Sequence, residues 1–156
     1  MTVTVRPYRE SDLAAWRELN TAWLAEAGFA IEDKDLRAIE HPHETILDRG
    51  GRIFIAEMDG GSAIGCCALL LMEDGGLELG KMAVAPRARR AGIGRRLLEA
   101  CQDAARTVGA PRLYLETSHR LAAAQALYRS FGFVDLPPRP SPYARAEVFM
   151  EKRLRD

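Results

Sequence analysis

The chain has 156 residues, of which 47% are apolar and 28% charged. This balance is typical of a folded globular protein, and the length suits one domain spanning residues 1–156. Because 22 acidic residues balance 22 basic ones, the net charge gives no support to nucleic-acid binding.

Apolar runs and cysteines indicate the compartment. The longest apolar run, residues 63–72, is about half of the roughly 20 residues that a membrane helix needs, and we expect no signal peptide. Cys66, Cys67 and Cys101 are odd in number and lie in apolar segments, so we expect buried, reduced thiols. No cysteine or histidine pattern has metal-ligand spacing, so we expect no metal. These features favour a cytoplasmic protein without membrane contact.

The N-terminal segment predicts a strand followed by a helix. Residues 2–5 alternate and include β-branched side chains, and Pro7 is expected to end this strand. Ser11 is the expected N-cap of a helix with regularly spaced apolar residues that runs to Gly28. We expect Trp16, on the apolar side of this helix, to be part of the core.

The middle of the chain changes from helical to strand periodicity. Residues 32–47 predict a second helical stretch, with Leu36 and Ile39 among its apolar positions. It is interrupted at Pro42, because the residue before a proline disfavours helix. A meander of three antiparallel strands with glycine-containing turns follows. These strands are residues 52–58, 62–73 and 77–84.

The C-terminal half predicts alternating helices and strands. An amphipathic helix over residues 93–108 leads to a strand at residues 113–117, which should lie parallel to the strand before that helix. The next helix is expected to end at Gly132, and strands follow from Phe133 and at residues 147–154. The pattern therefore predicts an α/β domain with a mixed sheet.

A loop rich in arginine and glycine lies between residue 84 and the amphipathic helix. Gly92 and Gly94 lack a Cβ, so the backbone can approach a ligand closely, and the first N–H groups of a helix have no intrahelical acceptor. Five arginines, Arg87, Arg89, Arg90, Arg95 and Arg96, surround these amides. The arginines could form only a solvated face and the glycines only a cap. Their order between a strand and a helix favours a phosphate or pyrophosphate site.

The chain resembles the GNAT (GCN5-related N-acetyltransferase) family in two motifs. The run from Arg89 to Gly94 fits the family's Arg-x-x-Gly-x-Gly signature, and the run from Ala124 to Phe133 fits its Ala-x-x-Leu-Tyr-x-x-x-Gly-Phe pattern. The two motifs lie about 35 residues apart, each in its expected setting. The resemblance covers most of the chain. It implies a GNAT-like, mostly antiparallel mixed sheet that splays between the fourth and fifth strands.

The resemblance also implies acetyl-CoA as cosubstrate and assigns residues to it. The main chain of Met82, Ala83 and Val84 would bind the pantetheine arm like an added strand. The pyrophosphate would bind the loop residues Arg89, Arg90, Ala91, Gly92, Ile93, Gly94 and Arg95. An asparagine that many relatives carry seven residues before the tyrosine is Leu121 here, so Ser118 or His119 would replace that contact unless it is lost.

Two catalytic roles follow from the resemblance. Tyr128 matches the general acid that protonates the coenzyme thiolate, and a phenol with a pKa near 10 is protonated at neutral pH. Glu78 is the expected base, acting directly or through water, with Glu116, His119 and bulk water as alternatives. Each of these residues could instead have only a structural role.

The acceptor is the least determined part. In the family that the chain resembles, the acceptor pocket tends to be surrounded by the segments that here carry Trp23, Glu32, Lys81, Tyr143 and Arg145. Of these residues, Lys81 and Arg145 could bind a carboxylate. We therefore expect a small amine or amino acid as acceptor, ahead of a protein lysine or N-terminus.

Two other functions are weighed against an N-acetyltransferase. A non-catalytic acyl-CoA sensor would keep the loop without needing Tyr128. A dinucleotide-binding oxidoreductase is disfavoured because the chain has no GxGxxG and a meander precedes the loop. The oligomeric state is left open, with a homodimer as one option.

Overall fold

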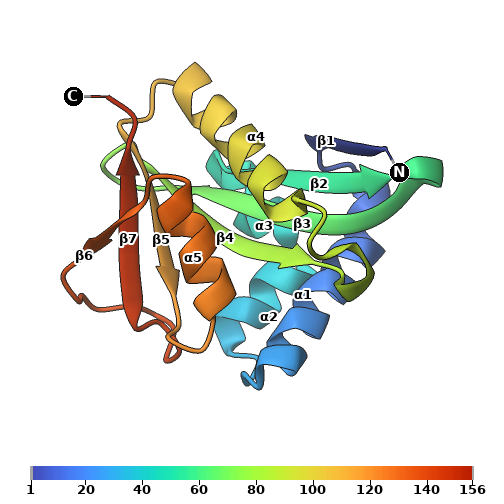
Figure 1. Ribbon diagram of the computed structural model, residues 1–156, viewed down its shortest axis with the longest axis horizontal. Coiled ribbons are helices and arrows are strands. Elements are labelled where there is room, and N and C mark those ends of the chain that lie inside the picture. Colours follow the sequence, from blue (N-terminus) through green and yellow to red (C-terminus); the bar gives the residue numbers. More distant parts are fainter. Residues whose placement is uncertain (1, 156) are drawn as a thin grey trace.

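A seven-stranded sheet forms the centre of the computed structural model, which describes residues 2–155 (Figure 1). The strand order is β1-β2-β3-β4-β5-β7-β6. The strands are β1 (Val3–Pro7), β2 (Arg52–Met58), β3 (Ser62–Leu71), β4 (Leu77–Val84), β5 (Arg112–Thr117), β6 (Val134–Leu136) and β7 (Val148–Arg153). In these described residues β4 and β5 pair in parallel and the other neighbours are antiparallel. The expected mixed, mostly antiparallel sheet is confirmed.

Helices cover both faces of this sheet. They are α1 (Leu13–Ala27), α2 (Asp33–Glu40), α3 (Pro42–Thr45), α4 (Ile93–Thr107) and α5 (Ala122–Ser130). Figure 1 shows α4 and α5 on one face of the sheet and α1 to α3 on the other. Because both faces are covered, residues 64–69 of β3 are all buried. Within residues 2–155, none of the helices combines the length and apolar character needed to cross a membrane.

The start of α1 differs from the sequence prediction. A short 3-10 turn, Glu10–Asp12, precedes the helix, and Ser11 lies inside this turn instead of capping α1. The Asp12 carboxylate accepts the Arg9 N–H at 2.7 Å and pairs with Arg6 at 2.8 Å. The prediction of Ser11 as the N-cap is wrong because Asp12 takes the local backbone donor. The expected end of α1 at Gly28 is confirmed, with a φ of +75° at that residue.

Helix α2 turns a different side toward the core than its leucine suggests. The expected interruption at Pro42 is confirmed, since α2 ends at Glu40 and α3 begins at Pro42. However, Leu36 is 49% exposed, whereas Asp35 is 0% exposed. The buried side of α2 therefore includes a carboxylate, which needs partners of opposite charge.

Several core predictions are confirmed. Trp16 is fully buried, and its indole N–H donates to the carbonyl of Ala38 at 3.0 Å, which ties α1 to α2. The three cysteines are buried free thiols. On α4 the buried side chains include Leu97 and Leu98, each of which stabilises the fold by about 1.5 to 3 kcal/mol through burial.

The parallel strands β4 and β5 separate after three residue pairs. Leu77, Glu78 and Leu79 pair with Leu113, Tyr114 and Leu115, and the described pairing stops there. The register of β3 against β4 shifts between Cys66 and Ala68, opposite the segment in which Lys81 has a φ of +53°. The rest of β4 is thus unpaired on its β5 side, and the expected splay between the fourth and fifth strands is confirmed.

Candidate active site

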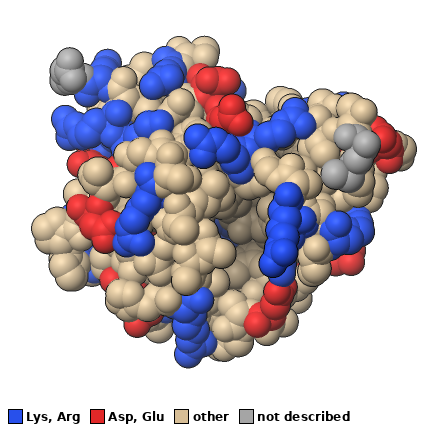
Figure 2. Space-filling view, viewed as in Figure 1, with Lys and Arg blue, Asp and Glu red and all other residues tan. Residues whose placement is uncertain are grey.

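A cavity of about 820 Å³ occupies the opening between β4 and β5. Its lining comes from both sides of the sheet: Trp23 of α1 and Lys34 of α2 lie on one side and Tyr128 of α5 on the other. Figure 2 shows the face of Figure 1 with a hollow near its middle, bordered by basic side chains. The splay therefore joins the two faces of the sheet in one site.

The loop before α4 presents unpaired amide groups. None of the backbone N–H groups of residues 90–95 donates a hydrogen bond within the described residues 2–155. Arg90 and Gly92 have left-handed backbones, with φ values of +67° and +73°. Such turns bring successive N–H groups together as an anion site at a helix N-terminus. The loop thus has the donors that a pyrophosphate requires.

The arginine side chains of this loop differ in their contacts. Arg90 and Arg95 are exposed. The guanidinium of Arg89 holds the Glu26 carboxylate of α1 at 2.5 and 2.7 Å, and both side chains of this pair are largely exposed. An exposed ion pair is weak, so a phosphate can replace the carboxylate. Arg89 also lines the cavity, which brings it within the same site as the free amides.

The two loop glycines have different surroundings. A Cβ at Gly92 would meet no atom within 4 Å. A Cβ at Gly94 would lie 3.0 Å from Cδ2 of Leu127 and 4.0 Å from Cε of Met82, which places it between α4 and α5. Gly92 thus meets the requirement of a left-handed turn, whereas Gly94 keeps open the space between two helices.

The three residues expected to bind the pantetheine arm lie on the splayed part of β4. Met82, Ala83 and Val84 line the cavity and have no β5 partner. A strand edge left unpaired in this way offers backbone groups to an extended ligand.

Tyr128 lies on the α5 side of the cavity. Its ring packs edge-on against Phe133 with centroids 5.9 Å apart, and only 8% of the residue is exposed. Burial, with smaller contributions from the Cys67 and Cys101 thiols, raises the pKa of the Tyr128 phenol above its ordinary value. Within residues 2–155 the hydroxyl makes no hydrogen bond, so its proton is available to a group in the cavity.

Glu78 lies on the opposite, α2 side. Burial and the nearby Glu116 carboxylate raise the pKa of Glu78 to about 7, although Lys34 and Lys81 act in the opposite direction. A carboxylate with a pKa near 7 is partly ionised at neutral pH. It is also a stronger base than an ordinary carboxylate, so it can accept a proton from a substrate. Its side chain has no hydrogen-bond partner within residues 2–155 and lines the cavity.

The alternative bases are engaged elsewhere. Glu116 lines the cavity, but its two oxygens accept hydrogen bonds from Tyr114 at 2.7 Å and Ser141 at 2.6 Å. His119 is exposed and is not part of the cavity lining. Ser118, named as a substitute for the missing asparagine, lines the cavity but donates to Glu147 at 2.9 Å. Leu121 also lines the cavity. Geometry thus favours Glu78 over Glu116 and His119.

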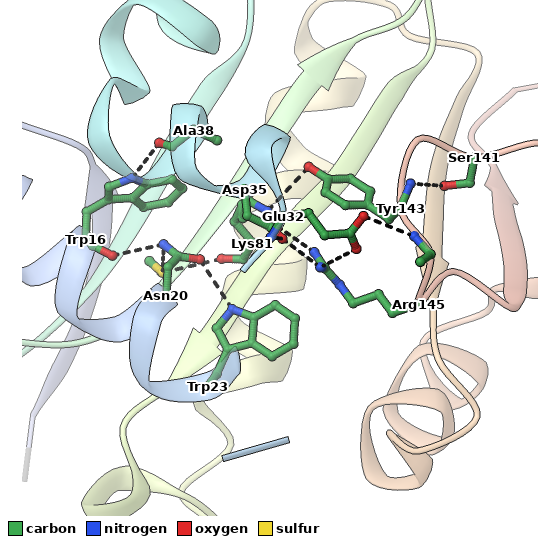
Figure 3. A network of polar contacts seen from close by, with 12 residues as sticks. Trp16, Asn20, Trp23, Glu32, Asp35, Ala38, Lys81, Ser141, Tyr143 and Arg145 are labelled. Carbon is green, nitrogen blue, oxygen red and sulfur yellow. Dashed lines mark hydrogen bonds and ion pairs between the residues drawn. The ribbon is translucent and has the colours of Figure 1, made fainter. Parts of the chain in front are cut away.

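The residues expected at the acceptor pocket gather around Asp35, which the sequence analysis missed (Figure 3). Its carboxylate lies 2.5 Å from Nζ of Lys81 and accepts hydrogen bonds from both terminal nitrogens of Arg145, at 2.6 and 2.8 Å. The guanidinium of Arg145 also lies 3.4 Å from the carboxylate of Glu32. Lys81 and Arg145 therefore share Asp35 as their main anionic partner.

Aromatic side chains surround these cations. The Arg145 guanidinium lies 4.4 Å from the ring centroid of Tyr143 and 5.6 Å from that of Trp23. The Lys81 ammonium lies 4.9 Å from the Tyr143 centroid. Of the five residues expected at the acceptor pocket, Trp23, Lys81, Tyr143 and Arg145 line the cavity, and Glu32 contacts it through Arg145.

Comparison with known proteins fits this geometry. Residues 13–133 match the model of the Acetyltransferase (GNAT) family. The chain belongs to this family. The GNAT chain is accordingly an acetyl-CoA-dependent acetyltransferase, and the resemblance seen in its two sequence motifs is confirmed.

Individual relatives agree with this membership. IAA acetyltransferase from Azospirillum brasilense is 42% identical over 106 residues, which are 65% of this chain and 67% of that protein. A GNAT acetyltransferase from Staphylococcus aureus Mu50 has a similar fold, with a TM-score of 0.89, 22% identity and coverage of 99% and 100% of the two chains. The Salmonella typhimurium protein YncA, solved with its cofactor acetyl-CoA, has a TM-score of 0.74, 25% identity and coverage of 100% and 96%.

Proposed function

We propose that this GNAT protein transfers the acetyl group of acetyl-CoA to a primary amine of a small molecule, by direct attack of the amine. One observation carries the proposal: a single cavity through the sheet has Glu78 on one face and Tyr128 on the other. Neither side chain has a hydrogen-bond partner within residues 2–155, so both are available to reactants.

The two side chains have complementary tasks in this reaction. Acetyl-CoA supplies an acetyl group activated as a thioester. Glu78, directly or through a water, takes one proton from the ammonium form of the acceptor, and the neutral amine nitrogen then forms the new bond to the acetyl carbon. As the carbon–sulfur bond breaks, Tyr128 donates its proton to the departing thiolate, and the second proton lost by the nitrogen restores the phenol of Tyr128 through solvent. The raised pKa of each group suits its task, because Glu78 is partly ionised at neutral pH and is a stronger base than an ordinary carboxylate, whereas Tyr128 remains protonated.

The loop and β4 position the reactants. The free N–H groups of residues 90–95, with Arg89 and Arg90, would hold the pyrophosphate, and the unpaired edge at Met82, Ala83 and Val84 would hold the pantetheine arm. Fixing the thioester beside Glu78 and Tyr128 lowers the entropic cost of reaction.

A small acceptor is favoured over a protein. Ion pairs from Asp35 to Lys81 and Arg145 connect α2, β4 and the segment before β7 on the acceptor side of the cavity. Such a wall limits the room for a folded partner. The 42% identical relative, named IAA acetyltransferase, points in the same direction.

A screen of acceptors tests the proposal. Purified protein is incubated with acetyl-CoA and, in turn, with small primary amines, a lysine peptide and a peptide with a free N-terminus, and free thiol is measured. We expect amine-dependent thiol release with small amines. Release with peptides alone would assign a protein acceptor, and acetyl-CoA binding without release for any amine would favour an acyl-CoA sensor.

A further inference from the structure

Three cations on the α2 side of the cavity have no anionic partner. They are Lys34, Arg37 and Arg49, and all three line the cavity and are exposed. Within residues 2–155 their side chains form no ion pair and no hydrogen bond. The Lys34 ammonium lies 5.4 Å from the ring centroid of Tyr143 and acts on the Glu78 carboxylate only through its field, without an ion pair.

The other charges near this end of the cavity are already paired. Asp35 compensates Lys81 and Arg145, and Glu116 accepts two hydroxyl hydrogen bonds. Glu40 pairs with Arg17 at 3.2 Å, and Asp48 lies 3.1 Å from His43. Besides Glu116, the charged side chains that line the cavity and have no ion pair in residues 2–155 are these three cations, Glu78, and Arg120, whose guanidinium donates to the carbonyls of Ala27 and Gly28.

Apolar side chains line the same cavity as these cations and Glu78. They include Ile46, Leu70, which is paired with Glu78 between β3 and β4, and Leu71, which is 55% exposed. A ligand that spans from Glu78 to the cations would bury an apolar portion against these side chains. Its far end would need a negative charge, and a cationic end would be repelled.

We propose that the acceptor amine also carries a carboxylate, that an apolar chain or ring separates the two groups, and that Lys34, Arg37 and Arg49 bind the carboxylate. This inference rests on the proposed function, since it presupposes a small amine beside Glu78. It replaces the expectation that Lys81 and Arg145 bind the carboxylate, because Asp35 and Glu32 already pair with these two cations. Arginine is suited to this task since its planar guanidinium binds a carboxylate through two hydrogen bonds.

Matched amines test the charge preference. The kcat/KM values are compared for 5-aminopentanoate and its amide, for 4-(aminomethyl)benzoate and its amide, and for 1,5-diaminopentane. We expect at least one carboxylate amine to exceed its amide by about 10-fold or more, and the diamine to be poorer than both. In Arg37→Gln/Arg49→Gln the KM of the carboxylate amine should rise, and its advantage should fall below about 3-fold.

Controls separate this inference from the proposed function. Arg52→Gln removes an exposed arginine that does not line the cavity, and it should keep the full preference. If the double variant does not fold, Lys34→Gln is tested instead, and it should also reduce the preference for the carboxylate amine over its amide. Amines acetylated without charge preference, or a preference unchanged in the variants, would overturn the inference while the proposed function stands. Thiol release with none of the amines would refute both.

Discussion

The carboxylate of Asp35 lies 2.5 Å from the ammonium of Lys81, whose backbone leaves the strand conformation with a φ of +53°. The side chains are 0% and 7% exposed, respectively. Burial alone would raise the pKa of Asp35, but hydrogen bonds from Arg145 and Lys81 outweigh it and lower this pKa to about 2. A buried carboxylate on α2 thus holds the irregular segment of β4 that precedes Met82.

Removing this charge should cost both stability and coenzyme binding. Asp35→Asn leaves Lys81 and Arg145 without their shared anion, and breaking a buried pair costs roughly 3 to 5 kcal/mol. We expect that loss in urea unfolding at pH 7, with a higher KM for acetyl-CoA. Asp33→Asn, at an exposed position of the same helix, is the control. Equal stability of the two variants would show that Asp35 does not hold β4.

Replacing Tyr128 should lower turnover without weakening the binding of acetyl-CoA. Tyr128→Phe removes the proton donor but keeps the ring that packs against Phe133. We expect kcat to fall by about 10²-fold, with the Kd of acetyl-CoA within about 2-fold of wild type. Assays of thiol release measure kcat, and calorimetry measures the Kd of acetyl-CoA. Unchanged kcat would mean that water or no group at all protonates the thiolate.

Coenzyme binding should depend on the amides next to Gly92. Gly92 and Gly109 both have positive φ, at +73° and +74°, and a Cβ at either meets nothing within 4 Å. Valine at either position therefore imposes the same kind of backbone strain. We expect Gly92→Val to weaken acetyl-CoA binding by about 10-fold or more, and Gly109→Val to leave it unchanged. Equal Kd values for both variants would argue against the phosphate role of the loop.

Local signals made much of the site predictable. The run from Arg89 to Gly94 and the Tyr128 motif each combine sequence neighbours, so their chemistry is visible without tertiary structure. Some strand boundaries also followed from periodicity and glycine turns: β2 and β4 begin and end where they were predicted, whereas β3 ends at Leu71, two residues before its predicted end. Such features depend on residues that are close in the sequence.

Long-range partners were not predictable in this way. Asp35 is 46 residues from Lys81 and 110 from Arg145, and no local pattern indicates those pairs. The spacing of Asp35, Ala38 and Ile39 was the available signal, because these buried positions share one side of α2. The leucine at position 36 obscured it by suggesting a different apolar side.

The raised pKa of Glu78 predicts a dependence of stability on pH. The folded protein holds this proton up to about pH 7, whereas the ordinary value is 4.5. The folded state is therefore favoured at low pH, and this contribution is lost as the pH rises from about 4.5 through 7. Glu78→Gln should be more stable than wild type by about 1 to 3 kcal/mol at pH 8 and nearly equal at pH 4. Urea unfolding at both values measures this. A stability difference that is the same at both would show an unperturbed carboxyl.

The pH dependence of acceptor kcat/KM in wild type and Glu78→Gln tests the central claim, that Glu78 deprotonates the amine. Wild-type kcat/KM should rise through an apparent pKa near 7. The variant should lose this limb, be slowest relative to wild type near neutral pH, and recover much of its rate at high pH, where solvent has already deprotonated the amine. A variant slowed by the same factor at every pH would contradict the claim and leave Glu78 only an orienting role.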